Sequence, residues 1–221
     1  MDLEQARFNM IEQQIRPWDV LDSAVLELLS VVKRENFVPL AHKALAFVDM
    51  EIPLREGGAR GQVMLAPRVE ARLLQDLNVQ KHEKVLEIGA GSGYMAALLA
   101  HRAQRVISLE IEPELARLAR ANLQQAGIHN VEVREADGAK GTLVDGPFDV
   151  ILLSGSVAEV PQQLLSQLKV GGRLAAIVGD EPVMRATFIT RHGENSFTTA
   201  QPWDTVAPRL LNFPEPSGFT F

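Results

Sequence analysis

The feature that most constrains the fold is an alternation of apolar strands and amphipathic helices that begins at Lys84. KVLEIG (84–89) reads as a short buried strand, and YMAALLAHRA (94–103) follows it as a helix. The later strands are RVISLEI, VEVREAD, FDVILLSG and RLAAIVG, and the later helices are PELARLARANLQQAG and EVPQQLLSQLKVGG. Because strands that alternate with helices form parallel sheets covered on both faces, the sequence predicts a doubly wound α/β fold.

The two ends of the chain depart from this alternation. About the first 45 residues carry helical stripes of apolar residues, and Asp22 is placed as the N-cap of the second stripe. Residues 50–66 are rich in glycine and read as an irregular loop, after which Pro67 opens a helix. Near the other end, ATFITRHGENSFTTAQ (186–201) reads as an antiparallel hairpin. We expect one compact domain, with N-terminal helices and a substrate loop in 1–83 and a cofactor-binding Rossmann-like core in 84–221.

The composition excludes several classes of site. The 221 residues include no cysteine, so disulfides, thiolate metal sites and cysteine nucleophiles are ruled out, and the five histidines are too scattered for a metal site. A net charge of −6 disfavours nucleic acid as a partner, because phosphate binding needs a basic face. No apolar run reaches the ~20 residues of a membrane span, and the first residues do not form a signal peptide. The expected location is therefore the cytoplasm.

The stretch KVLEIGAGSGY places Gly89, Gly91 and Gly93 between the first strand of the core and its helix. Doubly wound sheets bind ligands at this carboxyl end of a strand. Dinucleotide folds carry a third glycine where this chain has Tyr94, which disfavours NAD or FAD, and no Lys-Ser or Lys-Thr follows to make a P-loop. The glycines alone are also compatible with a tight turn that serves packing.

Three acidic residues narrow the choice of ligand. Glu87 lies in the first core strand, Glu110 ends the second and Asp137 ends the third. A carboxylate after the second strand suits a ribose diol, and one after the third can accept a hydrogen bond from an exocyclic amine. Glu87 would repel a pyrophosphate and suit a cationic ligand. S-adenosylmethionine combines a ribose, an adenine, an ammonium and a sulfonium, and it has no phosphate.

These blocks, together with SLEIEPEL, FDVILLSGS and VPQQLLSQLKVGGRLAAIVG, resemble class I S-adenosylmethionine-dependent methyltransferases. More narrowly, they resemble the protein-L-isoaspartate O-methyltransferase family, and the likeness extends upstream through NMIEQQI, ENFVP and GQVMLAP and downstream to VAPRLL. The resemblance implies methylation of the carboxylate of isoaspartyl residues in damaged proteins. By the resemblance, Glu87, Gly89, Gly91 and Gly93 line the methionine end of the cofactor, Glu110 takes the ribose, and Asp137 and Gly138 border the adenine. Ala90 and Ile111 are further cofactor-binding candidates.

The sequence departs from the family in the loop that precedes the first core helix. The family pattern G-Q-T-I-S-x-P is replaced by GQVMLAP, so that Val63 stands where Thr is expected and Leu65 where Ser is expected. An isoaspartyl carboxylate is ionised at pH 7 and needs donors that orient it rather than a base. Losing one donor to a charged group costs about 1.5–3 kcal/mol. Arg68, in the first turn of the next helix, is a candidate substitute, although an arginine that simply reaches into solvent is the simpler explanation.

Three alternatives to isoaspartate methylation stay open on the sequence alone. The chain could use S-adenosylmethionine with another acceptor, either an apolar small molecule lodged against Val63 and Leu65 or a different protein site. It could also be a non-catalytic protein that binds the cofactor, or nothing, and works through its surface, since the hydroxyl residues are missing. An NAD-dependent oxidoreductase is disfavoured by Tyr94 and by the lack of an evident proton donor.

Overall fold

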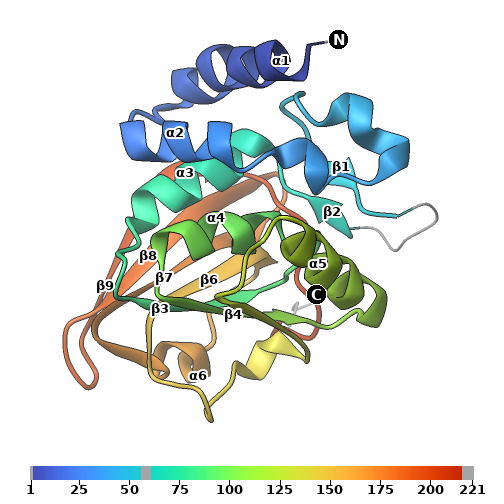
Figure 1. Cartoon of the computed structure of the whole chain (residues 1–221). Helices are drawn as coiled ribbons and strands as arrows, with labels where there is room; N and C mark the ends of the chain where they lie inside the picture. The colour runs from blue at the N-terminus through green and yellow to red at the C-terminus, as the bar shows by residue number, and fades with distance from the viewer. Residues whose placement is uncertain (1, 56–60, 216–221) are drawn as a thin grey trace, which may run out of the picture.

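The computed structural model describes residues 2–55 and 61–215, and its centre is a seven-stranded sheet of order β5-β4-β3-β6-β7-β8-β9 (Figure 1). The strands β5, β4, β3, β6 and β7 run parallel to their neighbours, whereas β8 and β9 are antiparallel additions. The strands of this sheet are β3 (Lys84–Ile88), β4 (Arg105–Glu110), β5 (Val131–Glu135), β6 (Phe148–Val157), β7 (Leu168–Asp180), β8 (Val183–Arg191) and β9 (Phe197–Thr205). The predicted parallel core and C-terminal hairpin are confirmed.

Helices cover both faces of the sheet. The α-helices are α1 (Leu3–Met10), α2 (Ser23–Val31), α3 (Pro67–Leu77), α4 (Tyr94–Arg102), α5 (Pro113–Gln125) and α6 (Gln162–Leu165). Figure 1 shows α3, α4 and α5 on one face with α1 and α2 stacked beyond α3, and α6 on the opposite face. Short helical turns connect them: η1 (Ile11–Ile15), η2 (Arg16–Trp18), η3 (Arg34–Asn36), η4 (Leu40–Leu45) and η5 (Gly138–Lys140). No helix in the described ranges is long and apolar enough to cross a bilayer.

Strand alternation divides the interior into two cores. In β3, Val85 joins the core under α3, α4 and α5, whereas Leu86 joins the core on the α6 side, and both side chains are fully buried. Val106 and Ile107 of β4 divide in the same way. Because neighbouring side chains of a strand point to opposite faces, a strand buried on both faces reads as a continuous apolar run.

The helices α2 and α3 begin where the sequence predicts. Asp22 caps α2 by accepting hydrogen bonds from the backbone N–H groups of Ala24 and Val25, and Pro67 is the first residue of α3. The loop at 50–66 contains a small antiparallel pair, β1 (Ile52–Pro53) with β2 (Val63–Met64), which the glycine-rich composition did not indicate.

The helix expected over 159–172 is mostly wrong. Only Gln162–Leu165 is helical, and β7 already begins at Leu168, which pairs with Phe148. Gly172 lies so close to β6 that an added Cβ would come within 2.9 Å of the carbonyl oxygen of Asp149. Pairing with the central sheet therefore overrides the local helical pattern of this segment.

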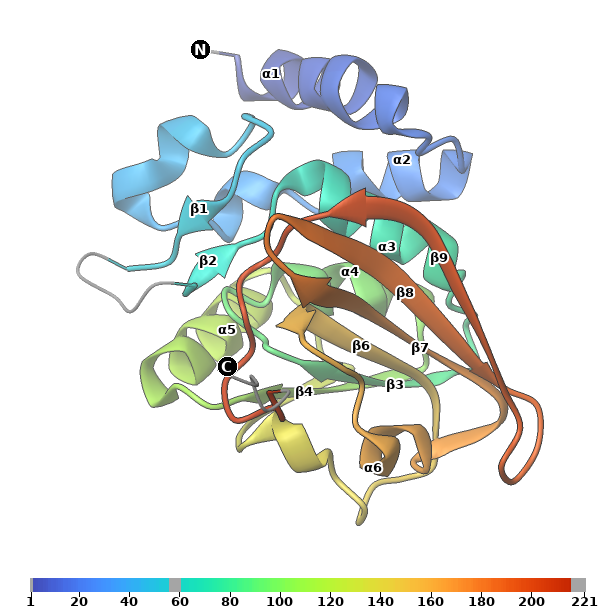
Figure 2. The same cartoon turned by 180° about the vertical axis from the view of Figure 1, so that it is seen from behind.

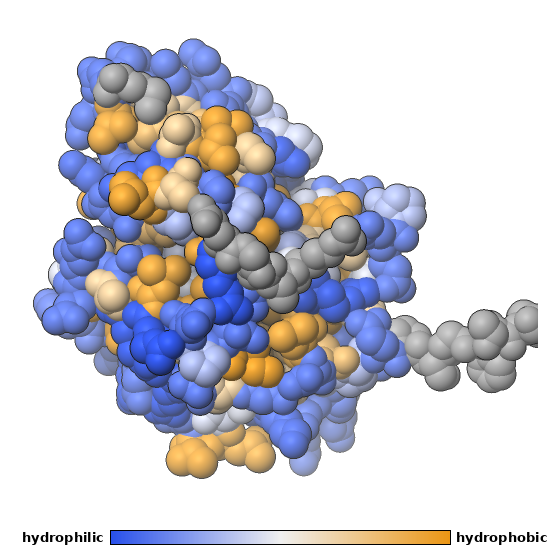
Figure 3. Space-filling view, turned by 90° about the vertical axis from the view of Figure 1, so that its right-hand side faces the viewer, coloured by the Kyte–Doolittle hydropathy of each residue, from blue (hydrophilic) through white to orange (hydrophobic). Residues whose placement is uncertain are grey.

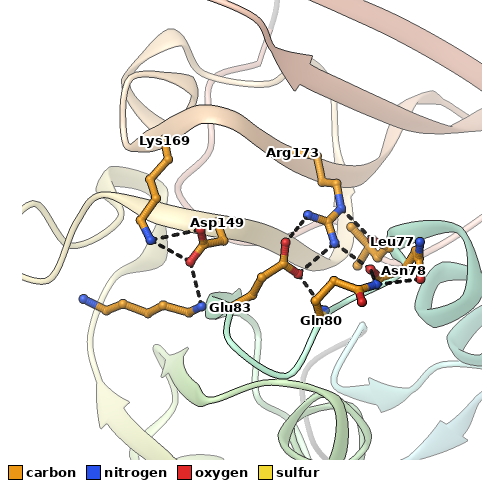
Figure 4. Close-up of polar contacts among 8 residues, drawn as sticks. Leu77, Asn78, Gln80, Glu83, Asp149, Lys169 and Arg173 are labelled. Carbon is orange, nitrogen blue, oxygen red and sulfur yellow. Dashed lines mark hydrogen bonds and ion pairs between the residues drawn. The ribbon is translucent and has the colours of Figure 1, made fainter.

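A polar network at the amino end of the strands joins α3 to the sheet (Figure 4). Arg173 of β7 donates to the carbonyl oxygens of Leu77 (2.6 Å) and Asn78 (2.9 Å) and to both carboxylate oxygens of Glu83. The carbonyls at the end of a helix have no partner within the helix, and the guanidinium supplies a donor to that of the buried Leu77. Burial alone would raise the pKa of Glu83, but Arg173 and the N–H of Gln80 outweigh burial and lower it.

We expect Arg173→Met to lower the free energy of unfolding by about 2–4 kcal/mol, because it takes the counter-ion from the buried Glu83 and the donor from the buried Leu77 carbonyl. The loss should be largest near neutral pH. The folded-state pKa of Glu83 lies below its ordinary value of 4.5, so its contribution is present above that value and disappears as the pH falls through the folded pKa. Urea unfolding at several pH values measures this. Arg185→Met is the control, since Arg185 forms an exposed pair with Asp204 on the neighbouring strands, and equal losses in both variants would contradict the account.

Candidate active site

A cavity opens at the carboxyl ends of β3, β4 and β6. Its walls come from the glycine turn after β3, the start of α5, the turn after β5, the strand β2 and the segment that follows β9. In Figure 2 the segment after β9 descends past the ends of β7 and β6 toward β4. Figure 3, which faces the side that carries β1, β2 and α5, shows hydrophobic and hydrophilic residues intermixed over this surface.

The glycine turn has the shape that its sequence predicts. Gly89, Gly91 and Gly93 have φ values of +93°, +53° and +84°, which L side chains rarely adopt. A Cβ on Gly93 would lie 3.1 Å from the carbonyl oxygen of Ala119, so that glycine allows α5 to approach. Gly89 and Gly91 line the cavity, whereas Ala90 is buried behind them.

Glu110 is the carboxylate that the fold places most firmly in the cavity. It is buried at the end of β4 and accepts hydrogen bonds from the backbone N–H groups of Gly91 (2.8 Å) and Glu112 (3.1 Å). These bonds fix its orientation and tie the glycine turn to the start of α5. Ile111 lines the cavity beside it.

Asp137 and Gly138 form the far wall of the cavity. The carboxylate of Asp137 accepts from the N–H of Ala139 (3.0 Å) and from the side-chain amide of Asn212 (3.0 Å). A Cβ on Gly138 would lie 2.2 Å from Cγ2 of Ile88, so only glycine fits there. The structure therefore brings Glu110, Asp137 and the glycine turn to one cavity, as their strand-end positions predict.

Glu87 lies behind the cavity rather than in it. Its carboxyl group is fully buried and accepts hydrogen bonds from the hydroxyls of Ser108 (2.6 Å) and Ser154 (2.9 Å). Burial raises the pKa of Glu87 to about 8, although the two hydroxyls act to lower it. Ser154 lines the cavity, so Glu87 contacts the cavity wall only indirectly, through its hydrogen bond with this serine.

The three residues that were candidates for holding the acceptor, Val63, Leu65 and Arg68, do not lie in one place. Val63 lines the cavity, next to Gly61 and Gln62. Leu65 is buried in the main core and borders a second hollow, together with Arg68. Arg68 forms an ion pair with Asp49, and its guanidinium carbon lies 4.4 Å from the centroid of the Trp18 ring.

Sequence reasoning missed the contribution of the segment after β9. Arg209, Leu210, Leu211 and Phe213 all line the cavity, and Leu210 covers Gly89 and Gly155. A parallel bridge to Ser156 holds the segment on β6. The motif VAPRLL signalled this placement, because it belongs to the family resemblance, but its residues were not assigned to the site.

Comparison with known proteins decides what this arrangement is. The family model of protein-L-isoaspartate(D-aspartate) O-methyltransferase matches residues 5–206. The chain belongs to this family. It is 42% identical to protein-L-isoaspartate O-methyltransferase 1 of Syntrophobacter fumaroxidans over 180 residues, which cover 81% of this chain and 82% of the relative. It is 38% identical to protein-L-isoaspartate O-methyltransferase 2 of Marinobacter nauticus over 211 residues, which cover 95% and 94% of the two chains.

Solved structures of isoaspartate methyltransferases agree on the fold. One protein-L-isoaspartate O-methyltransferase superposes with a TM-score of 0.77 at 24% identity, covering 92% of this chain and 66% of its own. A Plasmodium falciparum protein of the same class, solved with S-adenosyl-L-homocysteine, superposes with a TM-score of 0.74 at 18% identity, covering 92% and 98%. The resemblance predicted from the sequence is confirmed for the family and for the Rossmann-like fold.

Proposed function

We propose that this chain transfers a methyl group from S-adenosylmethionine to the carboxylate of isoaspartyl residues in proteins. The observation that supports this proposal is that, in a chain of this family, the expected cofactor-binding residues and the acceptor loop line the same cavity. One wall holds Glu110, Asp137 and the glycine turn, and the other holds the acceptor loop at Val63. Residues 1–83 would supply the acceptor loop and its support, and the core that follows would bind the cofactor.

The residues of the cavity suit this cofactor better than a nucleotide phosphate. Glu110 retains free lone pairs for the two ribose hydroxyls, and Asp137 can accept from the adenine amine. Ile111, Leu115 and Phe213 supply apolar surface beside them. Among the described residues that line the cavity Arg209 is the only basic one, and it pairs with Asp180. The glycine turn thus lacks the cations that a pyrophosphate would need.

In this reaction the main task of the protein is to orient the acceptor carboxylate toward the methyl group. The bound cofactor supplies an electrophilic methyl group on a sulfonium. The acceptor carboxylate is ionised at pH 7 and requires no general base, so the chain has to hold one carboxylate oxygen in line with that methyl group and exclude water. The wall that carries this task has Val63 in place of a hydroxyl residue, so the donors that fix the carboxylate must come from elsewhere.

We propose that Arg209 donates hydrogen bonds to the acceptor carboxylate and so replaces part of what the missing hydroxyl residues would supply. It lines the cavity and lies at the carboxyl ends of β6 and β7, where it donates to the carbonyl oxygen of Gly179 at 2.9 Å. Its acidic partners Asp180 and Glu215 are exposed. Because exposed ion pairs contribute at most about 1 kcal/mol, an acceptor carboxylate can replace them.

We expect Arg209→Met to lower kcat/KM for an isoaspartyl peptide by about 10- to 100-fold, the cost of one hydrogen bond to a charged group. The dissociation constant for S-adenosylhomocysteine should stay within about twofold of wild type, since Glu110 and Asp137 are untouched. Asp180→Asn is the matched control, because it neutralises one of the two acidic partners of Arg209 and leaves the guanidinium in place. A similar loss in Asp180→Asn would show that only the ion pair matters and would contradict the assignment.

A second acceptor class is favoured by one observation, the apolar side chain of Val63 on the cavity wall. An apolar small molecule would pack there without the donors that a carboxylate needs. The chain would then bind S-adenosylhomocysteine and methylate no isoaspartyl peptide.

Transfer of a radiolabelled methyl group to an isoaspartyl peptide tests the proposed function. The expected product is a methyl ester that mild base hydrolyses, releasing labelled methanol. Cofactor binding without such an ester would reject isoaspartate methylation and favour the second acceptor class.

A further inference from the structure

A buried ion pair lies between the N-terminal helical layer and the acceptor loop. Arg34 of η3 is fully buried and forms an ion pair with Glu70 of α3. Its Nη2 also donates to the backbone carbonyl oxygen of Leu65 at 2.8 Å. Its guanidinium carbon lies 5.1 Å from the centroid of the ring of Tyr94, the first residue of α4. One side chain thus contacts three other segments that meet behind the cavity.

Stability alone is a weak explanation for such a group. Taking an arginine and a glutamate out of water costs several kcal/mol for each ion, and well-packed apolar residues of similar volume often serve as well or better. Burial raises the pKa of Glu70 to about 7 against the opposing effect of Arg34, which reflects this cost. What an apolar pair cannot provide is the directed hydrogen bond to the carbonyl of Leu65.

That hydrogen bond acts on the acceptor side of the site. Leu65 lies two residues after Val63, which forms the cavity wall, and directly before the residues that open α3. Tyr94, on the other side of the guanidinium, follows directly on Gly93 of the glycine turn. The planar guanidinium therefore spans the acceptor loop and the end of the cofactor turn.

We propose that Arg34 is a positioning residue for methyl transfer, which holds the acceptor loop in register with the glycine turn through the carbonyl of Leu65. This inference rests on the proposed function, because it concerns the alignment of the acceptor with the cofactor. Transfer reactions are sensitive to such alignment, and a misplacement of about 1 Å can cost about 100-fold in rate.

The same layer contains a matched control. Arg7 of α1 and Glu35 of η3 form a second buried ion pair, with side chains 4% and 7% exposed. Among the described residues, the side-chain bonds and ion pairs of Arg7 go to Glu35 and Glu4, and none reaches the acceptor loop. Losing this pair removes a comparable buried interaction without touching Leu65.

The test compares Arg34→Lys with Arg7→Lys. Lysine keeps the charge but lacks the planar fork that lets arginine bind Glu70 and the Leu65 carbonyl together. Amide hydrogen exchange over residues 61–66 should be faster in Arg34→Lys and unchanged in Arg7→Lys. With an isoaspartyl peptide, kcat should fall by about 10- to 100-fold in Arg34→Lys only. KM and the affinity for S-adenosylhomocysteine should stay within about twofold of wild type in both variants.

Equal effects of the two substitutions on exchange and kcat, or no effect of Arg34→Lys on either, would overturn the inference. If Arg34→Lys does not fold, Glu70→Gln replaces it. That variant keeps the shape of the partner while weakening its hold on Arg34, and it should give a smaller change of the same sign; unchanged exchange and kcat would again count against a positioning role. A wild-type protein that methylates no isoaspartyl peptide would reject the proposed function, while the exchange comparison would still decide whether Arg34 holds the loop.

Discussion

Replacing Glu110 with alanine is expected to weaken binding of S-adenosylhomocysteine by about 100- to 1000-fold, or about 3–4 kcal/mol. The loss has two sources. The proposed bonds from the ribose hydroxyls disappear, and the N–H groups of Gly91 and Glu112 lose the acceptor that orders the glycine turn. Isothermal calorimetry measures the change directly.

Two further variants show whether the loss comes from recognition of the ribose. Glu110→Gln keeps one oxygen acceptor and should bind more tightly than the alanine variant. Glu114→Gln removes an exposed carboxylate that pairs with Arg55 in the first turn of α5, close to Glu110 in the chain. This variant should bind S-adenosylhomocysteine like wild type. A Glu110→Ala protein that is folded and binds with wild-type affinity would contradict the assigned cofactor site.

Restoring a hydroxyl at Val63 is the second large expected effect. Val63→Thr is nearly isosteric and places a donor on the wall of the cavity, so kcat/KM for an isoaspartyl peptide should rise by about 10- to 100-fold. Steady-state kinetics at saturating S-adenosylmethionine provide the measurement.

Leu65→Ser, the other substitution that the family pattern suggests, should behave differently. Leu65 packs in the main core and does not line the cavity, so its loss is expected to cost about 2–4 kcal/mol of stability with no gain in rate. Should Val63→Thr fold and bind cofactor yet gain no activity, donation from this position would not be what limits acceptor binding.

The sequence predicts the core of this fold because local and tertiary signals agree there. Residues 84–135 alternate between strands and helices, Pro113 is the first residue of α5, and β3 and β4 are buried apolar runs. The prediction failed at 159–172, where Leu164, Leu165 and Leu168 have helical spacing although Leu168 pairs with β6. Spacing within a segment carries no information on the strand that lies beside it.

The residues of the candidate site likewise fall into those that the sequence predicts and those that it does not. Glu110, Asp137 and the glycines were predictable because the carboxyl ends of parallel strands meet at one edge. Arg209 and Arg34 were not, since each acts through contacts with segments far away in the chain. That Val63 faces the cavity while Leu65 faces the core depends on how β2 leads into α3, which the motif alone does not specify.

The central claim is selective methylation of the isoaspartyl carboxylate. Its most direct test offers the wild-type protein and S-adenosylmethionine two peptides of identical sequence, one with an isoaspartyl linkage and the other with a normal aspartyl linkage, and follows intact mass. The account predicts that the isoaspartyl peptide alone gains one methyl group, and that mild base removes it. No added methyl group on either peptide, in a protein that binds S-adenosylhomocysteine, or equal methylation of both, would contradict it.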